Sequence, residues 1–222
     1  GYPDFKFALN ESVLSEPDNT ALHGKIVLSD NLQQVSDKLL ASKIAVLNST
    51  ATLNSTELLE QAVQMLRDAH RIHISGIGAS ALVAKDFSYK LQKLGTAALA
   101  ETDTHVQLAN IANYTAEDVL VVISESGETP DSVKITEQAA ANGVNIISIT
   151  AYGANSVARL ASLNLYTVAE ESSARLSSIL ARNAQELVID TLFILLTQTC
   201  PQGRKKLAAS NKAVDTFLAR KR

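Results

Sequence analysis

The sequence lacks the features that mark several classes of protein. It has one cysteine, Cys200, which excludes an internal disulfide and suits a reducing compartment. Its longest apolar run, residues 187–196, is interrupted by Asp190 and Thr191, so it is too short to cross a bilayer and predicts a buried helix. The first residues contain no apolar segment of a secretory signal. We therefore expect a cytoplasmic protein that has no membrane partner.

An excess of basic residues is also missing. The chain has 20 Lys and Arg against 23 Asp and Glu, which gives a net charge of −3. This balance does not indicate a surface that binds nucleic acid. The two basic clusters, residues 204–206 and 220–222, are typical of solvated helix ends. The 222 residues are enough for one large domain or two small ones with a substantial core.

From residue 30 onward, short strand-like runs alternate with helical patterns. We predict strands at residues 71–75, 96–100, 118–124, 144–150 and 163–168. We predict helices at residues 79–94, 103–113, 130–142 and 173–199, a short helix before the last strand, and a final helix after Pro201. Two more helices precede the first strand, with Asp30 capping one and Ser55 or Thr56 capping the other. The runs VLVVIS and VNIISIT are apolar without alternation, as in strands buried on both faces. These patterns predict an α/β fold, a three-layer αβα sandwich around a parallel sheet of about five strands.

Two loops rich in glycine and hydroxyl groups follow strands of this sheet. They are ISGIGAS at residues 74–80 and ISESGETPDS at residues 123–132. Ligands of an open parallel sheet bind beyond the carboxyl ends of the strands. Each loop offers backbone N–H groups, hydroxyls and a helix N-terminus, and these groups favour an anion. Either loop alone could be an ordinary strand–helix junction, but the pair favours a phosphate site. A nucleoside triphosphate is disfavoured because no Walker lysine accompanies the loops, and GIGAS lacks the third glycine of a dinucleotide fingerprint.

The pair GIGAS and SESGET resembles the two phosphate-binding loops of the SIS (sugar isomerase) domain. With GIGASALVAKDFSYKLQKLG, ETDTHVQ and ESSARLSSILARNAQELVIDTLF, the chain resembles the effector-binding half of RpiR-type bacterial transcriptional regulators over about residues 30–200. GYPDFKFAL resembles the last helix of the helix-turn-helix domain that precedes the SIS domain in that family. This resemblance implies a helix-turn-helix remnant at residues 1–14, a linker at 15–29 and an SIS domain at 30–222. It also implies that the DNA-reading helix belongs to a segment that precedes residue 1, consistent with the missing initiator Met.

The resemblance further implies which residues bind the phosphate. The hydroxyls would come from Ser80, Ser124, Ser126 and Thr129, with help from the backbone of Ala79 and Gly127.

The resemblance also implies a less specific set of residues for the sugar. His105 lies in the DTH segment, which is near the sugar in related regulators, although it could equally cap a helix turn. Glu101 could face the same crevice. Glu171 and Arg175 match a Glu and an Arg at the start of the family's long helix, where Arg175 could instead form a salt bridge between subunits. Glu125 stands where many relatives have an aromatic residue or His, and its carboxylate would be unfavourable beside a phosphate unless it turns away.

The implied function is that of an effector domain that senses a phosphorylated amino sugar. The two loops look closest to regulators of N-acetylmuramic acid 6-phosphate use, with sensors of N-acetylmannosamine 6-phosphate next. The resemblance implies a homodimer or a dimer of dimers, operator DNA bound through a preceding domain, and no cofactor, metal or catalysis. The alternative is a sugar-phosphate isomerase or etherase with His105, Glu101 or Glu171 as its base. A purely structural dimerisation module is a third interpretation, which the two intact loops weaken.

Overall fold

A five-stranded parallel sheet forms the centre of the molecule. The computed structural model describes residues 21–169 and 177–219. The strands lie in the order β4-β3-β5-β6-β7, and each neighbouring pair is parallel. Their bounds are Ile72–Gly76 (β3), Ala98–Ala100 (β4), Val119–Ile123 (β5), Asn145–Ala151 (β6) and Leu163–Thr167 (β7). The predicted α/β class and the parallel sheet of five strands are confirmed.

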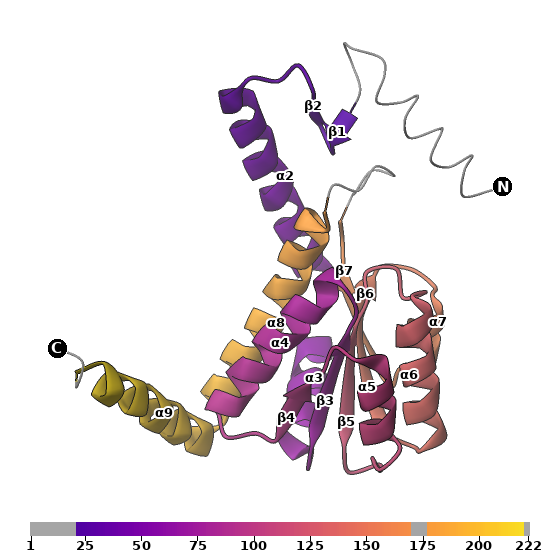
Figure 1. The fold of residues 1–222 in the computed structure, drawn as a ribbon, viewed down its shortest axis with the longest axis vertical. Helices are drawn as coiled ribbons and strands as arrows, with labels where there is room; N and C mark the ends of the chain where they lie inside the picture. Colours follow the sequence, from indigo (N-terminus) through magenta and orange to yellow (C-terminus); the bar gives the residue numbers. More distant parts are fainter. Residues whose placement is uncertain (1–20, 170–176, 220–222) are drawn as a thin grey trace.

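Helices cover both faces of this sheet, which makes three layers. Those described are Leu32–Leu53 (α2), Thr56–Asp68 (α3), Ala79–Lys93 (α4), Thr104–Ile111 (α5), Pro130–Ala141 (α6), Ser156–Leu160 (α7), Ile179–Thr199 (α8) and Pro201–Ala219 (α9). One face packs against α3, α4 and α8, and the other packs against α5, α6 and α7 (Figure 1). The short connections place the N-termini of α4 and α6 directly beyond the carboxyl ends of β3 and β5.

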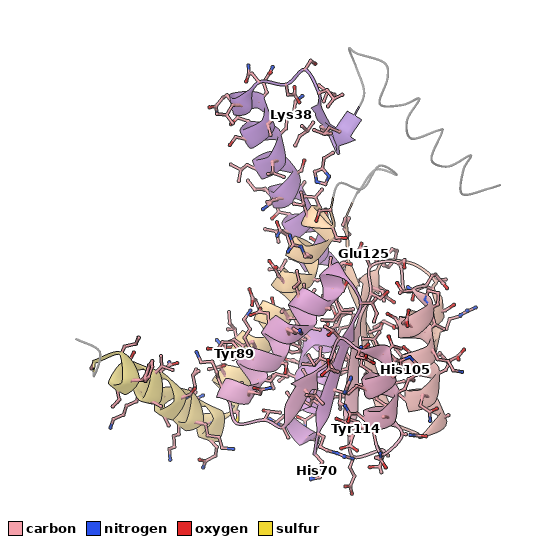
Figure 2. The ribbon with its side chains drawn as sticks, viewed as in Figure 1. Lys38, His70, Tyr89, His105, Tyr114 and Glu125 are labelled. Carbon is pink, nitrogen blue, oxygen red and sulfur yellow. The ribbon has the colours of Figure 1, made fainter. Side chains whose placement is uncertain are left out.

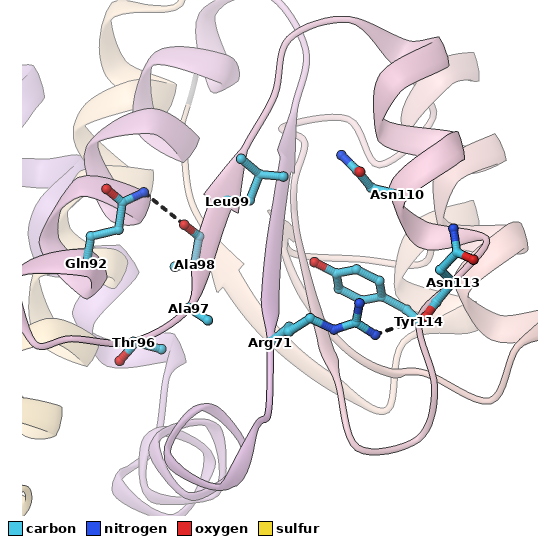
Figure 3. Close-up of a pocket in the computed structure, with 9 residues that line it drawn as sticks. All are labelled: Arg71, Gln92, Thr96, Ala97, Ala98, Leu99, Asn110, Asn113 and Tyr114. Carbon is cyan, nitrogen blue, oxygen red and sulfur yellow. Dashed lines mark hydrogen bonds between the residues drawn. The ribbon is translucent and has the colours of Figure 1, made fainter.

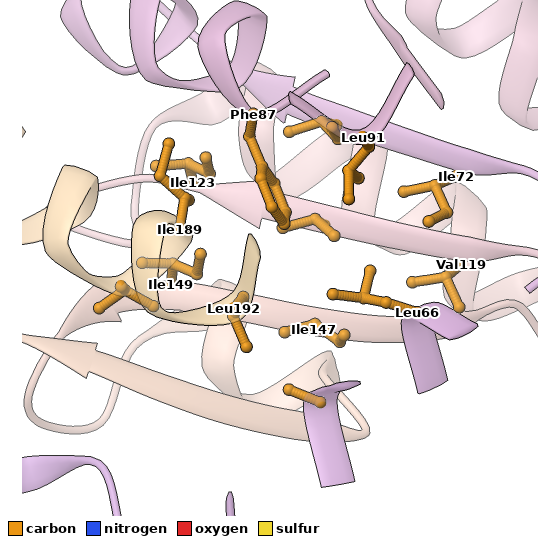
Figure 4. Close-up of a cluster of buried hydrophobic side chains, with 14 of the residues drawn as sticks. Leu66, Ile72, Phe87, Leu91, Val119, Ile123, Ile147, Ile149, Ile189 and Leu192 are labelled. Carbon is orange, nitrogen blue, oxygen red and sulfur yellow. The ribbon is translucent and has the colours of Figure 1, made fainter. Parts of the chain in front are cut away.

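The central strand β5 shows why these strands have continuous apolar sequences. Val121 and Ile123 belong to the same core cluster as Phe87, on the α4–α8 side. Figure 4 shows Ile123 and Phe87 in this cluster. Leu120 and Val122 join the separate core on the α5–α6 side. All five side chains are buried, and each such burial contributes about 1.5–3 kcal/mol to folding. An alternating polar residue would therefore be costly on either face.

The start of α2 differs from the prediction by one residue. Asn31, not Asp30, is the N-cap, and its side chain forms a capping box with Gln34. The Asp30 carboxylate instead accepts hydrogen bonds from the Val27 N–H, at 2.8 Å, and from Lys38 Nζ. Asp30 was misassigned because two adjacent residues with capping side chains compete for one position, and the contact with Lys38 spans eight residues.

Two parts of the described chain extend away from the sheet. A small antiparallel hairpin, Ala21–His23 (β1) and Ile26–Val27 (β2), lies beside the far end of α2, within the segment predicted to be a linker (Figure 1). At the other end, α9 projects from the body, and Gly203 is its one buried residue among those described. The predicted start of the long helix at residue 173 lies outside the described residues, and the described helix begins at Ile179. No described helix is both long enough and apolar enough to cross a membrane.

Candidate functional site

A small pocket of about 90 Å³ lies beyond the carboxyl ends of β3 and β5. Its described walls come from the two predicted loops and from the start of α8. They are Ile77, Ala79, Ser80, Ile123, Ser124, Glu125, Ser126, Thr129, Ser132 and Ser178. The structure therefore brings together Ala79 and all four of the hydroxyls that were predicted to bind the phosphate.

Three helices begin at this pocket, and none is capped by its own N-cap side chain. Their N-caps are Gly78 for α4, Thr129 for α6 and Ser178 for α8. The first N–H groups of a helix have no partner within the helix, and the helix dipole places partial positive charge there. The starts of α4 and α6 therefore present N–H groups and positive potential to one small volume. An anion is the ligand that such an arrangement favours.

Hydroxyl groups supply the remaining polar lining. Ser124 is 4% exposed, and within the described part of the chain its hydroxyl has no hydrogen-bond partner. The oxygen of Ser126 accepts from the Glu128 N–H at 3.2 Å, which leaves its own hydrogen available to donate. The described walls contain no Lys, Arg or His. Here the charge of an anion would be balanced by helix termini and neutral donors.

Gly127 shapes the second loop without lying on the pocket wall. Its φ of +62° is in the left-handed region, and a Cβ there would lie 2.0 Å from Oδ1 of Asn155. Its N–H donates to the Ser124 carbonyl at 3.2 Å, and its carbonyl accepts from the Val157 N–H at 3.1 Å. These contacts bring the loop against α7. Only glycine fits this position, and a direct contact of its backbone with a ligand stays a prediction.

Glu125 turns its carboxylate away from the Ser124 side of the loop. Oε2 accepts from Oγ1 of Thr167 at 3.1 Å and from Nε2 of Gln185 at 3.4 Å, on β7 and α8. Figure 2 shows Glu125 at the end of the sheet beside these elements. Residues 124 and 125 follow the end of β5, but they continue its hydrogen bonds to β6, since the Ser124 N–H donates to the Ile149 carbonyl and the Ala151 N–H donates to the Glu125 carbonyl. Their side chains therefore point to opposite faces of the sheet. Glu125 belongs to the pocket wall, but these contacts direct its carboxylate toward β7 and α8.

The two described residues predicted to contact the sugar do not line the pocket. His105 is an exposed residue in the first turn of α5, and its N–H donates to Asp103 Oδ1 at 2.8 Å (Figure 2). The Glu101 carboxylate accepts from the N–H groups of Thr102 and Asp103, and these bonds lower its pKa. Both residues follow β4, the strand next to β3, so they lie to one side of the pocket. Glu171 and Arg175 fall outside the described residues.

Sequence reasoning missed two hydroxyl residues of the described pocket wall, Ser132 and Ser178. Ser132 lies in the first turn of α6 and is completely buried. Ser178 is the N-cap of α8, which starts more than fifty residues after Ser124. PDS at residues 130–132 was a visible signal for Ser132, because the third helical position faces the same way as the N-cap. No local signal could place Ser178 there, because it depends on how α8 packs.

Behind the pocket, on the α5–α6 side of the sheet, lie further polar side chains that have no hydrogen-bond partner among the described residues. They are His73, Ser75 and Gln107, each with 0% exposure. Burial lowers the pKa of His73, and the nearby Gln107 amide and Glu101 carboxylate oppose this lowering. Although Gln107 is close to His73, the two side chains do not meet in a well-formed hydrogen bond. The ring of His73 packs edge-on against Tyr114, with centroids 6.1 Å apart. We refer to His73, Ser75 and Gln107 as the rear polar group.

A second and larger hollow, of about 500 Å³, lies beside the edge strand β4 (Figure 3). The one cation among its described lining residues, Arg71, is paired with Asp118, because Nε and Nη2 donate to that carboxylate at 3.0 and 2.7 Å. Nη2 also donates to the Asn113 carbonyl, and the guanidinium stacks 4.4 Å from the Tyr114 ring centroid. The hydrogen bonds from Arg71 lower the pKa of Asp118. The contacts of Arg71 with Asp118 and Tyr114 stabilise the fold beside this hollow. The charge of Arg71 is thus balanced within the protein by Asp118.

Comparison with known proteins agrees with this geometry. The family model of the SIS domain matches residues 65–195, which include both loops and the pocket. The chain belongs to the SIS domain family. It is 38% identical over 200 residues to an uncharacterized HTH-type transcriptional regulator, YfhH of Escherichia coli, and the match covers 89% of this chain and 71% of YfhH. The chain is thus related to helix-turn-helix transcriptional regulators.

Solved structures share the fold over most of the chain. The Vibrio vulnificus NanR protein, solved with ManNAc-6P, superposes with a TM-score of 0.79 at 22% identity, over 98% of this chain and 76% of NanR. The sugar isomerase domain of an RpiR transcription factor from Sphaerobacter thermophilus gives 0.74 at 23% identity, over 83% of this chain and 99% of that domain. A phosphoheptose isomerase from Neisseria gonorrhoeae also shares the fold, with a TM-score of 0.65 at 22% identity, over 76% of this chain and 100% of the isomerase. The fold therefore occurs in both regulators and enzymes.

Proposed function

We propose that this chain is the effector-binding part of an RpiR-type transcriptional regulator, and that its pocket binds the phosphate of a phosphorylated sugar. The observation that carries the proposal is the meeting of three helix starts without side-chain caps at one pocket lined with hydroxyls. A phosphate offers several acceptor oxygens, which match these donors. The pocket is large enough for a phosphate but not for a whole sugar, so the sugar extends outward.

The effector is an amino sugar 6-phosphate. N-acetylmuramic acid 6-phosphate ranks first because the two loops look closest to its regulators, and N-acetylmannosamine 6-phosphate ranks second. The structural likeness to NanR, which was solved with ManNAc-6P, supports testing both sugars. His105 and Glu101 beside the pocket, with Glu171 and Arg175, form the sugar side of the site. The regulator works in the cytoplasm as a homodimer or a dimer of dimers, and it binds operator DNA through a preceding domain.

Isothermal calorimetry tests this function with the two sugar phosphates and with unphosphorylated N-acetylmannosamine. We expect one phosphorylated sugar to bind at a single site, and the unphosphorylated sugar to bind far more weakly or not at all. Ser126→Ala should weaken binding by roughly 1–3 kcal/mol, as expected for a lost hydrogen bond to a charged group. Equal affinity for the sugar with and without its phosphate would contradict the proposal.

A sugar-phosphate isomerase or etherase is the second candidate, because a phosphoheptose isomerase shares the fold. Isomerisation needs a base within reach of a carbon-bound proton. Glu101 already accepts two backbone hydrogen bonds, which lower its pKa and make it a weaker base, and His105 does not line the described pocket wall. Incubation of the chain with each sugar phosphate, followed by NMR of the mixture, should show the ligand unchanged. Turnover would favour the enzyme instead.

A further inference from the structure

Ser132 has an unusual environment for a serine in a helix. It is the third residue of α6, its side chain is 0% exposed, and its hydroxyl has no hydrogen-bond partner among the residues that the structure describes. Other helical hydroxyls in the described chain bond to the carbonyl four residues earlier; examples are Ser42, Thr136, Thr191 and Thr197. Ser132 makes no such bond, because the residue four positions earlier, Glu128, precedes the N-cap of α6. Its hydroxyl must therefore find its partner elsewhere.

Packing alone does not explain a serine at this position. An unpaired buried hydroxyl is costly, and an alanine would fill nearly the same space without that cost. Ser132 shares the pocket with Ser124, whose hydroxyl is also buried and unpartnered. Two unsatisfied hydroxyls thus lie in one small polar pocket. Ser124 comes from the loop that follows β5, and Ser132 comes from α6. Both are ready to donate to the same group.

We propose that Ser132 is a further phosphate-binding residue, which closes the floor of the pocket together with Ser124. This inference rests on the proposed function and adds a residue outside the set predicted from the sequence. Rotation about χ1 moves a serine hydroxyl between three staggered positions, so the hydroxyl can turn toward a bound phosphate oxygen. The backbone N–H of Ser132 lies in the first turn of a helix whose N-cap makes no side-chain bond, so it adds a second donor in the same direction.

A matched pair of variants on α6 tests this role. Ser132→Ala removes an unsatisfied hydroxyl from the pocket floor. Thr136→Val, one turn later, removes a hydroxyl that is equally buried but already donates to the Ser132 carbonyl at 2.6 Å and does not line the pocket. The probe is inorganic phosphate, with the better-bound sugar phosphate as a second ligand. Affinity is measured by calorimetry and Tm by thermal unfolding of the free proteins.

Ser132→Ala should change the phosphate affinity, whereas Thr136→Val should change Tm. Ser132→Ala should lower phosphate affinity about tenfold to a hundredfold, the effect of one lost bond to a charged group, while Tm stays the same or rises. Thr136→Val should lower Tm and leave the affinity within about twofold of the wild type. Wild-type affinity in Ser132→Ala would overturn the inference and leave the proposed function intact. A loss of both Tm and affinity in Ser132→Ala would show a structural role and also overturn it. If the wild-type chain bound neither phosphate nor a sugar phosphate, the proposed function itself would be wrong.

Discussion

Seven of the described helices, α2 to α8, start in two different ways, and the difference follows their position. Away from the pocket, α2, α3, α5 and α7 begin with side-chain caps from Asn31, Ser55, Asp103 and Asn155. At the pocket, α4, α6 and α8 begin without such a bond. An N-cap hydrogen bond contributes about 0.5–2 kcal/mol to the free energy of unfolding. The helices that start at the pocket lack this contribution. A bound anion supplies what a cap would supply, and its binding should stabilise the fold.

The largest effect is expected when a helix at the pocket receives a cap of its own. Thr129 has an extended backbone, with φ −61° and ψ 122°, which suits an N-cap residue. Thr129→Asp should place a carboxylate at the start of α6 and raise the stability of the free protein by about 0.5–2 kcal/mol. The same charge should repel phosphate by about 4 kcal/mol at close range and lower its affinity at least a hundredfold. Thermal unfolding and calorimetry measure the two changes.

The converse change at a capped helix is the control. Ser55 accepts from the Leu58 N–H at the start of α3 and does not line the pocket. Ser55→Ala should lower the free energy of unfolding by about 1 kcal/mol and leave phosphate affinity unchanged. If Thr129→Asp still bound phosphate like the wild type, the start of α6 would not be part of the anion site.

A smaller effect is expected where the second loop meets the capped helix α7. Gly127→Ala would put a Cβ onto the Asn155 side chain, which caps α7 through the Ala158 N–H and donates to Thr150 Oγ1. We expect a loss of stability of about 1–3 kcal/mol and a clear loss of phosphate affinity, because the loop must move. Gly143→Ala is the matched control, since its φ is +70° but nothing lies within 4 Å of the added Cβ. Equal losses in both variants would show that φ alone, and not the contact with Asn155, limits position 127.

The smallest effect concerns the rear polar group and depends on pH. Burial lowers the pKa of His73 from 6.5, so below that pH the unfolded chain binds a proton that the folded chain resists. Stability should therefore fall as pH drops from about 8 to about 5.5, and His73 can account for at most about 1.4 kcal/mol of the loss. His73→Leu should reduce this loss, as measured by denaturant unfolding at both pH values. It should leave phosphate affinity at the higher pH unchanged if the helix starts carry the binding. An identical pH dependence in the variant would mean that His73 does not contribute.

Local patterns in the sequence predict much of this structure. Apolar runs such as VLVVIS correctly indicated strands buried on both faces, and glycine and hydroxyl residues after β3 and β5 marked the pocket. The same patterns missed Ser178, because its position depends on the packing of α8 against the sheet. They also left open the orientation of Glu125, which contacts Thr167 and Gln185 from distant elements. Properties that depend on neighbours along the chain were predictable, and those that depend on tertiary contacts were not.

The most direct test of the anion site is a backbone amide NMR titration with N-acetylmannosamine 6-phosphate, repeated with inorganic phosphate. The amides of Ala79, Ser80, Asp131 and Ser132, at the starts of α4 and α6, should shift together and give one dissociation constant. The amides of Glu57 and Val106, at the capped starts of α3 and α5, should not follow that curve. Shifts centred on Arg71 and Tyr114, or no shifts at the starts of α4 and α6, would contradict the account.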